Sequence, residues 1–563
     1  MELLAQNLAP LMFVALIAML LLGFPVAFTL AANGMLFALI GIWLGLLTPA
    51  LFQALPQRVF GVMTNDTLLA LPFFTFMGLI LERSGMAEDL LETVGQLFGP
   101  VRGGLAFAVV VVGALMAATT GVVSASVISM GLISLPIMLR YGYDRRVATG
   151  VIAASGTLSQ IIPPSLTLIV LADQLGRSVG DMYRAALVPG LILTGLYILY
   201  VGGMALFRPN LVPALPPEAR KLREPDGSSG LHSLVVLMVV SVVIAMLADG
   251  YFTAGASPID ERIVLGVLSW GVIAFVIASI NYIFRLKLLS RMAERVTFVM
   301  FPPLFLVFLV LGTIYIGLAT PTEGGAMGAA GALVLALIRK RMTLSLLRQA
   351  MESTTRLTCF AMFILIGSTV FSLTFRAING DLWVEHLLTD LPGGIYGFLI
   401  FSSIFIFIAA FFLDFFELAF IVIPLLGPVA DKMGIDLVWF GILMAVNMQT
   451  SFMHPPFGLA LFYLRSVAAH DDYKDAVTGK TIARVTTTQI YRGAIPFIVI
   501  QVAMVAVVMA FPQMVMHYKG TATQVDPSTI KIEVQGGQSP DNPYESAPPM
   551  QLQPLEPEHQ KQK

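Results

Sequence analysis

The sequence predicts an all-α polytopic membrane protein made of two inverted-topology repeats, each with a re-entrant helical hairpin and an interrupted helix. The 563-residue chain is 57% hydrophobic and only 12% charged, against about 45–50% and about 25% in average soluble domains. Its apolar stretches are long enough to cross about 30 Å of hydrocarbon. A pattern of polar residues and prolines also recurs in the second half at a constant spacing.

The apolar stretches that we expect to cross the membrane are 11–46, 66–83, 184–207, 232–248, 262–284, 300–338, 357–378 and 492–516. The first and sixth are long enough for two crossings each, and Pro25 and Pro321 break them. The double-length segments 103–139 and 394–430 are predicted to be hairpins, while 147–175 and 437–467 each carry a Pro-Pro pair.

Loop charge predicts the orientation of the chain. Short loops rich in Lys and Arg stay in the cytoplasm, and such loops lie near Arg145, Lys221, Arg291 and Lys340. All of them fall inside if segment 103–139 enters and leaves on the cytoplasmic side, in which case 394–430 enters from outside. About twelve crossings follow, with both termini outside the cytoplasm.

The chain is predicted to divide into four parts at changes of composition. We expect a first inverted repeat with scaffold helices, hairpin and interrupted helix, a linker with two extra transmembrane helices, a second inverted repeat, and a disordered tail rich in Pro, Gln and Glu. These parts are 1–207, 208–298, 299–517 and 518–563.

The internal repeat rests on four landmarks. Gly142, Asp144, Pro136 and Pro163 have counterparts in Gly434, Asp436, Pro428 and Pro455, and each counterpart lies 292 positions later. The interrupted helices are broken at Pro163-Pro164 and Pro455-Pro456, and Pro321 starts the helix after another break. Inverted repeats with interrupted helices at matching positions are the best sequence-level indication of a secondary transporter's binding site.

The residues around these breaks suit a cation and an anion. Breaking a helix inside lipid exposes backbone groups that must face protein, water, ion or substrate. Carbonyl and hydroxyl oxygens suit sodium, and helix amino ends favour a carboxylate. The predicted ion- and substrate-binding residues are Thr120, Gly121, Ser124, Ser126, Ser155, Gly156, Thr157, Asp414, Asn447, Gln449, Thr450 and Ser451. Asp414 is the strongest acidic candidate, because an ionisable residue in a membrane segment is a functional hypothesis by default.

Structural interpretations compete at several of these positions. Single Ser and Thr residues in membrane helices more often bond a neighbouring carbonyl than an ion. We expect Glu323 to cap the helix that Pro321 starts, and His454 to be packed rather than to carry protons. The single cysteine, Cys359, is interpreted as a small core residue.

Several function classes are excluded. The formal net charge is -1, with no basic tract able to follow a phosphate backbone, so we expect no nucleic-acid partner. No HExxH, GxSxG, P-loop or CxxC motif is found in the sequence, so we expect no enzyme and no nucleotide-driven pump. No cofactor is expected beyond sodium as coupling ion.

Four motifs resemble the large membrane (permease) subunit of tripartite ATP-independent periplasmic (TRAP) transporters, the DctM-like family. They are LALPFFTFMGLILERSGM, GYDRRVATGVIAASGTLSQIIPPSLTLIV, IGLATPTEGGAMGAA and GIDLVWFGILMAVNMQTSFMHPPFGLALF. The phrase SGTLSQIIPPS is similar to the subgroup labelled for mannitol or chloroaromatic compounds. The resemblance implies a sodium-driven elevator transporter that accepts an organic acid (carboxylate) from a periplasmic substrate-binding protein and works with a small TRAP membrane subunit.

The sequence departs from the family pattern at the implied ion sites. Val122 stands where many members have a serine, Ser159 and Ser451 where many have glycine, and His454 where threonine is common. Two alternatives remain open: a stand-alone organic-anion or cation symporter that needs no binding protein, and a membrane scaffold without transport. The sequence does not name the substrate.

Overall fold

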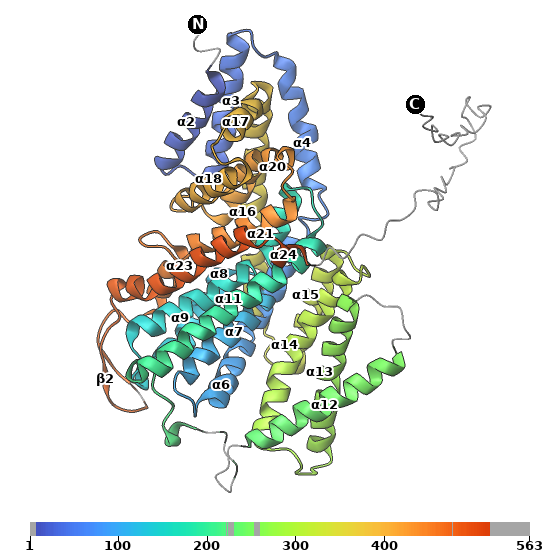
Figure 1. Cartoon of the computed structure of the whole chain (residues 1–563), viewed down its shortest axis with the longest axis vertical. Coiled ribbons are helices and arrows are strands. Elements are labelled where there is room, and N and C mark those ends of the chain that lie inside the picture. Colours follow the sequence, from blue (N-terminus) through green and yellow to red (C-terminus); the bar gives the residue numbers. More distant parts are fainter. Residues whose placement is uncertain are drawn as a thin grey trace, which may run out of the picture. The chain divides into compact units, whose positions relative to one another are not determined.

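The computed structural model describes residues 7–220, 222, 224, 230–252, 259–475 and 477–517. The side chains of residues 119–120, 248–252 and 259–265 lie outside this description, as does the tail 518–563 that was predicted to be disordered. The described part is helical almost throughout (Figure 1). Its only strands are β1 (Tyr473–Lys474) and β2 (Thr481–Ile482), a short antiparallel pair. The chain is therefore an all-α polytopic membrane protein, as predicted.

The first half of the chain ends at a long helix that precedes the predicted linker. Its elements are α2 (Leu8–Leu21), α3 (Val26–Trp43), η1 (Pro49–Gln53), α4 (Ala54–Met63), α5 (Ala70–Arg83), α6 (Met86–Phe98), α7 (Gly104–Thr120), α8 (Val123–Arg140), α9 (Arg145–Thr157), η2 (Leu158–Gln160), α10 (Leu166–Gln174) and α11 (Val179–Phe207).

Two short 3-10 turns and two helices follow, namely η3 (Pro209–Leu211), η4 (Pro217–Ala219), α12 (Leu231–Phe252) and α13 (Ile259–Ile283). The second half consists of α14 (Arg291–Tyr315), α15 (Pro321–Ile338), α16 (Leu344–Ala377), α17 (Gly380–Thr389), α18 (Gly394–Ala409), α19 (Phe415–Glu417), the π-helix η5 (Leu418–Val422), α20 (Ile423–Lys432), α21 (Leu437–Ser451), α22 (Leu459–Val467), α23 (Thr487–Ala510) and α24 (Gln513–Met516). Helix α14 begins before residue 299, where a boundary was predicted, and the four-part division stays a prediction.

The same local chemistry starts the corresponding helices of the two halves. Asp144 caps α9 by accepting from the amides of the second and third helical residues, and Asp436 caps α21 in the same way. A side-chain oxygen at this position satisfies amides that have no partner inside the helix. Gly142 and Gly434, two residues earlier, both have positive φ, 86° and 74°, which glycine adopts without steric cost. The aspartate and glycine of the sequence repeat therefore have the same roles in both halves: the aspartate caps a helix, and the glycine adopts a positive φ before it.

The halves pack against each other in an exchanged pattern. Helix α3 packs against α16, and α15, which follows the other proline break, packs against α5. Likewise α9 packs against α23, and α21 against α11. Figure 1 shows α7, α8, α9 and α11 running together in one layer beneath α23. Each half thus completes the core of the other, and both halves contribute to one buried cluster.

The predicted double-length segments are each folded as two helices. In the first hairpin α7 and α8 meet at Gly121, which has a positive φ of 60°. In the second, α18 ends at Ala409 and a new helix starts after Asp414. A glycine at the end of α7 allows the left-handed turn that stops the helix.

Eight helices in the described part are long and apolar enough to cross a membrane, and α17 with α18 forms a pair bent by 117° that adds at most one crossing. About twelve crossings were expected from the sequence. The difference arises because the other predicted stretches fold as shorter helices, such as α2 with 14 residues. A helix of that length spans about 21 Å at 1.5 Å per residue, which is less than the hydrocarbon thickness.

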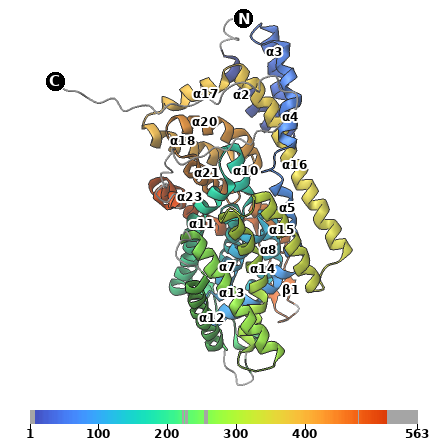
Figure 2. The same ribbon diagram turned by 90° about the vertical axis from the view of Figure 1, so that its right-hand side faces the viewer.

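Helix α16 is the longest helix described, with 34 residues. Figure 2 shows it extending along the molecule close to α5. Arg83 at the end of α5 fixes the two helices together, because its guanidinium donates to Gln349 Oε1 at 3.2 Å and Ser353 Oγ at 2.9 Å. This pair of helices forms one wall of the largest cavity.

Candidate functional site

The two interrupted helices place their breaks at equivalent positions. Helix α9 continues into η2, and residues 161–165 separate it from α10; residues 452–458 separate α21 from α22. Both Pro-Pro bonds, at Pro163-Pro164 and Pro455-Pro456, are cis. The first break is fully surrounded by protein: Ser165 is buried and donates its hydroxyl to the carbonyl of Gln160 at 2.6 Å.

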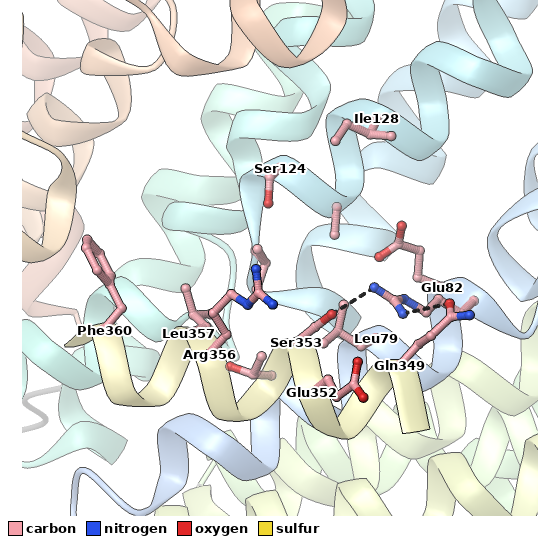
Figure 3. A pocket seen from close by; sticks show the side chains of 14 residues that line it. Leu79, Glu82, Ser124, Ile128, Gln349, Glu352, Ser353, Arg356, Leu357 and Phe360 are labelled. Atoms are coloured by element: carbon pink, nitrogen blue, oxygen red, sulfur yellow. Dashed lines mark hydrogen bonds between the residues drawn. The ribbon is translucent and has the colours of Figure 1, made fainter. Parts of the chain in front are cut away.

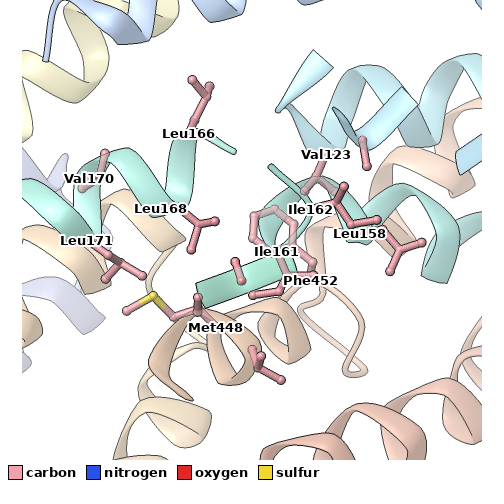
Figure 4. Close-up of a cluster of buried hydrophobic side chains, with 14 of the residues drawn as sticks. Val123, Leu158, Ile161, Ile162, Leu166, Leu168, Val170, Leu171, Met448 and Phe452 are labelled. Carbon is pink, nitrogen blue, oxygen red and sulfur yellow. The ribbon is translucent and has the colours of Figure 1, made fainter. Parts of the chain in front are cut away.

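Apolar side chains surround the first break. Figure 4 shows Ile161 and Ile162 of the first break in one buried cluster with Leu158 and with Phe452, which follows α21. Gly121, at the tip of the first hairpin, also reaches this place: a Cβ there would lie 3.5 Å from the carbonyl oxygen of Pro164. The hairpin tip and the first break are therefore neighbours, as the site prediction requires.

Thr157, the last residue of α9, is the centre of a buried hydrogen-bond network. Its hydroxyl accepts from Gln449 Nε2 at 3.2 Å and from Gln501 Nε2 at 3.3 Å, and it donates to the carbonyl of Ala154 at 2.8 Å. Gln501 Nε2 also donates to the Tyr197 hydroxyl at 2.8 Å. All four side chains of the network are fully buried. It links α9, α11, α21 and α23.

The contact between Thr157 and Gln449 joins equivalent residues, because the two positions lie 292 residues apart. That is the spacing of the sequence repeat. In a chain with two related halves, equivalent side chains meet only close to the axis that relates the halves. The ends of the two interrupted helices therefore meet at the centre of the repeat.

Several buried oxygens near these helix ends have no hydrogen-bond partner among the described residues. They include Ser155 Oγ, Gln160 Oε1, Gln449 Oε1 and Gln501 Oε1. An unsatisfied buried acceptor costs about 1–3 kcal/mol, and native proteins leave few of them. Amide and hydroxyl oxygens are the ligands that hard cations take, so this donor set fits a sodium ion. No group of three or more His, Cys, Asp or Glu side chains in the described part could hold a metal instead.

The remaining hydroxyls at the breaks bond to backbone carbonyls. Thr450 donates to Asn447 O at 2.6 Å, Ser451 to Met448 O at 2.5 Å and Ser159 to Gly156 O at 3.0 Å. Each hydroxyl oxygen keeps lone pairs that could bind a cation, but its proton is donated to a backbone carbonyl, as is common in membrane helices. Asn447 Nδ2 donates to the carbonyl of Ser403 at 2.7 Å, so this amide connects α21 to α18.

Four other predicted residues of the first half are Gly156, Ser126, Ser124 and Thr120. Gly156 is a close-packing residue, because a Cβ there would lie 2.3 Å from Val127 Cγ2 of α8. Ser126 is buried on α8. Ser124 instead lines a separate cavity, and the side chain of Thr120 lies outside the described residues.

Asp414 forms a cap at the start of α19. Its Oδ1 accepts from the amide of Glu417 at 2.9 Å, and Glu417 Oε2 accepts from the amide of Asp414 at 2.8 Å. This reciprocal arrangement is a capping box. Within the described residues no hydrogen bond joins Asp414 to segment 447–451, so its predicted role at an ion site stays a prediction.

Two structural interpretations agree with the structure. Thr320 and Glu323 form a capping box at the start of α15, where Pro321 is the first helical residue. His454 is buried between Phe411, stacked at 4.2 Å between ring centroids, and Phe407 at 4.6 Å. The Cys359 interpretation was wrong: the thiol is exposed, because it projects from α16 away from the core.

The largest cavity described has a volume of about 810 Å³ and lies between α8, α5 and α16 (Figure 3). Ser124 and Ile128 of α8 line one side, and Leu79, Arg356 and Phe360 line the other. Pockets for organic ligands commonly measure about 300–1,000 Å³. A small organic acid therefore fits this cavity with room for water.

Arg356 of α16 lines this cavity, is exposed, and was not among the predicted site residues. The predicted span began at residue 357, one residue after Arg356. In the structure α16 starts at Leu344, so Arg356 lies about 18 Å along the helix at 1.5 Å per residue.

A family model described as "Tripartite ATP-independent periplasmic transporter, DctM component" matches residues 13–514. The C4-dicarboxylate TRAP transporter large permease protein DctM of Pseudomonas aeruginosa is 28% identical over 468 residues, covering 83% of this chain and 89% of the relative. The 2,3-diketo-L-gulonate TRAP transporter large permease protein YiaN of Escherichia coli is 23% identical over 495 residues, covering 88% and 95%.

A third relative carries a longer chain. The isethionate TRAP transporter permease protein DctMQ of Oleidesulfovibrio alaskensis is 22% identical over 417 residues, which cover 73% of this chain and 54% of the relative. Among solved structures, the YdaH transporter of Alcanivorax borkumensis matches with a TM-score of 0.48 and 13% identity, covering 83% of this chain and 90% of the other.

Proposed function

Since the chain belongs to the DctM-component family of tripartite ATP-independent periplasmic transporters, a family of permeases and not of enzymes, we propose that it is the large membrane subunit of a sodium-coupled importer. Its substrate is a small organic acid that a periplasmic binding protein delivers. The relatives named above carry substrates such as C4-dicarboxylates and 2,3-diketo-L-gulonate in their names, which supports a carboxylate.

The observation that carries the proposal is the meeting of two interrupted helices at the Thr157–Gln449 hydrogen bond. Broken helices at matching positions of two repeats create substrate and ion sites in secondary transporters. The exchanged packing supports a two-fold relation between the halves, because α3 contacts α16 while its counterpart α15 contacts α5. The loop charges support opposite membrane topology of the two halves.

Sodium is the proposed coupling ion. Unpartnered oxygens of Ser155, Gln449 and Gln501 lie near the ends of α9 and α21, and the carbonyls at the breaks add further lone pairs. Binding of sodium there stabilises the arrangement of the hairpin tip against the break. A substrate carried by the same mobile domain then crosses with the ion, driven by the sodium gradient.

Transport proceeds by an elevator motion in this proposal. The hairpins and interrupted helices, α7–α11 and α18–α23, form the mobile domain, and α2–α5 with α14–α16 form the scaffold. The cavity supports this division because α8 supplies one wall and the scaffold helices α5 and α16 supply the other. A site that lies between two such bodies is exposed to alternate sides when one body slides.

We assign the protein to the bacterial inner membrane with both termini in the periplasm, working with a small membrane subunit and a substrate-binding protein. The arrangement of basic loops supports this orientation. A stand-alone symporter of related architecture is the alternative, and no described contact favours it.

Uptake in proteoliposomes tests the proposed function. We expect a vesicle that contains this chain and its small subunit to take up the ligand of the cognate binding protein only when that protein is added outside under an inward sodium gradient. An unrelated periplasmic binding protein is the control. Equal uptake by this chain with and without the cognate protein would establish the stand-alone symporter instead.

A further inference from the structure

Polar contacts join the scaffold to the proposed mobile domain near one end of their helices. Asn65 lies just before α5 of the scaffold, and its Nδ2 donates to Asp173 Oδ1 of α10 at 2.6 Å. The guanidinium of Arg184, on α11, donates to the carbonyl of Tyr315 at the end of α14, and its Cζ lies 5.8 Å from the centre of the Tyr315 ring. In the proposed orientation these helix ends lie on the periplasmic side.

The side chain of Asn65 is held in one orientation by the scaffold. Its Oδ1 accepts from the backbone amides two and three residues later, at 3.0 Å and 3.3 Å, so its Nδ2 is the end that faces Asp173. The same loop is tied to α15, because Thr322 Oγ1 donates to the carbonyl of Asp66 at 2.5 Å. The scaffold therefore presents a fixed donor to the mobile domain.

Asp173 is the half-buried carboxylate that receives this donor. Its second oxygen, Oδ2, accepts from Gln174 Nε2 at 2.8 Å. Hydrogen bonds to an ionised group are about twice as strong as bonds between neutral groups. A further bond across the boundary, from the Ser368 hydroxyl to the carbonyl of Phe420 at 2.5 Å, joins neutral groups. The charged contacts at the periplasmic ends are therefore the stronger kind.

The same boundary is hollow toward the cytoplasmic ends of these helices. The cavity of about 810 Å³ separates α8 from α5 and α16 (Figure 3), and its lining runs from Val122 at the hairpin tip to Arg83 at the end of α5. Ser129 Oγ donates across the boundary to Glu82 Oε1 at 2.6 Å on this side. The two domains thus meet through charged contacts on the periplasmic side and are separated by a cavity on the cytoplasmic side.

From this arrangement we propose that the two periplasmic contacts, Asn65 with Asp173 and Arg184 with Tyr315, form an outer latch that holds the mobile domain in the position open to the cytoplasm. The inference rests on the proposed elevator motion and names a device that regulates it. Both contacts must break when the mobile domain slides, because each joins a scaffold segment to a helix that moves. The outer latch favours this position until another interaction offsets it.

Distances between spin labels test the outer latch without substrate or sodium. In proteoliposomes that also contain the small subunit, one label is attached to Cys359, an exposed thiol on α16. The other is attached to Leu132→Cys on α8, where the native side chain is 57% exposed. Pulsed electron double resonance should give one main distance when the latch is intact. We expect Asp173→Ala to raise the ratio of a second, displaced population to the first about tenfold, as the loss of a hydrogen bond to a charged group predicts.

Asp431→Ala is the matched control for this measurement. Asp431 is also a carboxylate of the mobile domain, but it pairs with Arg177 of the same domain at 3.4 Å, and both side chains are exposed. Its loss should change the population ratio less than about twofold, because exposed ion pairs contribute little. Arg184→Gln should act in the same direction as Asp173→Ala. A ratio in monodisperse Asp173→Ala protein equal to that of the wild type would overturn the proposal.

A reversible link between the two sides of the outer latch is the second test. In a Cys359→Ser background, Asn65→Cys and Asp173→Cys are joined by a short bis-methanethiosulfonate. We expect the link to lower uptake at least about tenfold, because it prevents the domains from sliding, and dithiothreitol to restore the rate of the unlinked protein. Each single-cysteine variant, treated with the same reagent, should keep its uptake. Linked protein that transports at the unlinked rate would show that Asn65 and Asp173 need not separate, which would overturn the latch.

The spin-label distances do not depend on transport. If they respond to Asp173→Ala as expected while uptake proves independent of sodium, the proposed coupling fails and the outer latch stands. If uptake is sodium-dependent while neither the distances nor the link has the expected effect, only the latch inference fails.

Discussion

Thr157→Val is expected to lower sodium-dependent uptake at least about tenfold, because it removes the acceptor that holds two buried amides. Gln449 and Gln501 both donate to the Thr157 hydroxyl. Valine has nearly the same shape but no oxygen, so both amide groups lose a partner at about 1–3 kcal/mol for each unsatisfied group. A loss of about 1.4 kcal/mol already corresponds to a factor of ten.

The measurement is the initial uptake rate in proteoliposomes containing equal amounts of monodisperse protein. Thr149→Val is the matched control, because Thr149 lies two turns earlier on α9 and its hydroxyl donates only to backbone carbonyls, at 2.7 Å to Arg145 O. That variant should keep uptake within about twofold, since a local hydroxyl-to-carbonyl bond in a helix contributes little. Wild-type uptake by Thr157→Val would show that the network is not part of the ion site.

Gly150→Ala is expected to destabilise the protein strongly, because it separates the closest helix pair of the mobile domain. A Cβ at Gly150 of α9 would lie 2.1 Å from the carbonyl oxygen of Gly493 of α23. A Cβ at Gly493 would lie 2.1 Å from the carbonyl oxygen of Arg146. Both neighbours are backbone atoms in helices, so the helices must move apart, and overpacking of this kind costs about 1–3 kcal/mol or more.

Fluorescence-detected size-exclusion chromatography after heating gives the midpoint of unfolding for each variant. Gly203→Ala is the control, because Gly203 lies within α11 and an added Cβ meets nothing within 4 Å. It should leave the midpoint unchanged or raise it slightly, since alanine favours the helix more than glycine does. A midpoint for Gly150→Ala equal to that of the wild type would contradict the close approach of α9 and α23.

The repeat could be predicted from sequence because its landmarks are local. Asp144 and Asp436 cap helices, and Gly142 and Gly434 need positive φ, so each constraint acts within a few residues. Such constraints leave the same residue types at the same spacing in both halves. The helix breaks and the hairpins could be predicted from these matching residues.

Other parts of the site could not be predicted, because they depend on contacts between distant segments. Gln501 and Tyr197 lie in uninterrupted spans, and nothing in their local sequence shows that they meet Thr157. The predicted span began only at residue 357, because residues 344–356 mix polar and apolar side chains, although α16 continues through them. The hydropathy of a segment predicts whether it lies in lipid, but it does not predict which residues line a cavity.

Asp414 was predicted to be an ion-site residue because it lies in a membrane segment, and the capping signal in its local sequence was given less weight. The spacing Asp-Phe-Phe-Glu puts a carboxylate at the third helical residue after an acidic cap, which is the pattern of a capping box. The structure has that capping box between Asp414 and Glu417. Thr320 and Glu323 have the same spacing, and there the capping interpretation was made from the sequence.

The sodium dependence of uptake tests the central claim most directly. Proteoliposomes that contain the permease and its small subunit, supplied with the loaded binding protein, are diluted into buffer with either sodium or choline chloride at equal concentration. The account predicts rapid accumulation of the substrate with sodium outside and at most about a tenth of that rate with choline, in keeping with a coupling free energy of about 1.4 kcal/mol or more. Equal uptake in the two buffers would contradict a sodium site at the meeting point of the two broken helices.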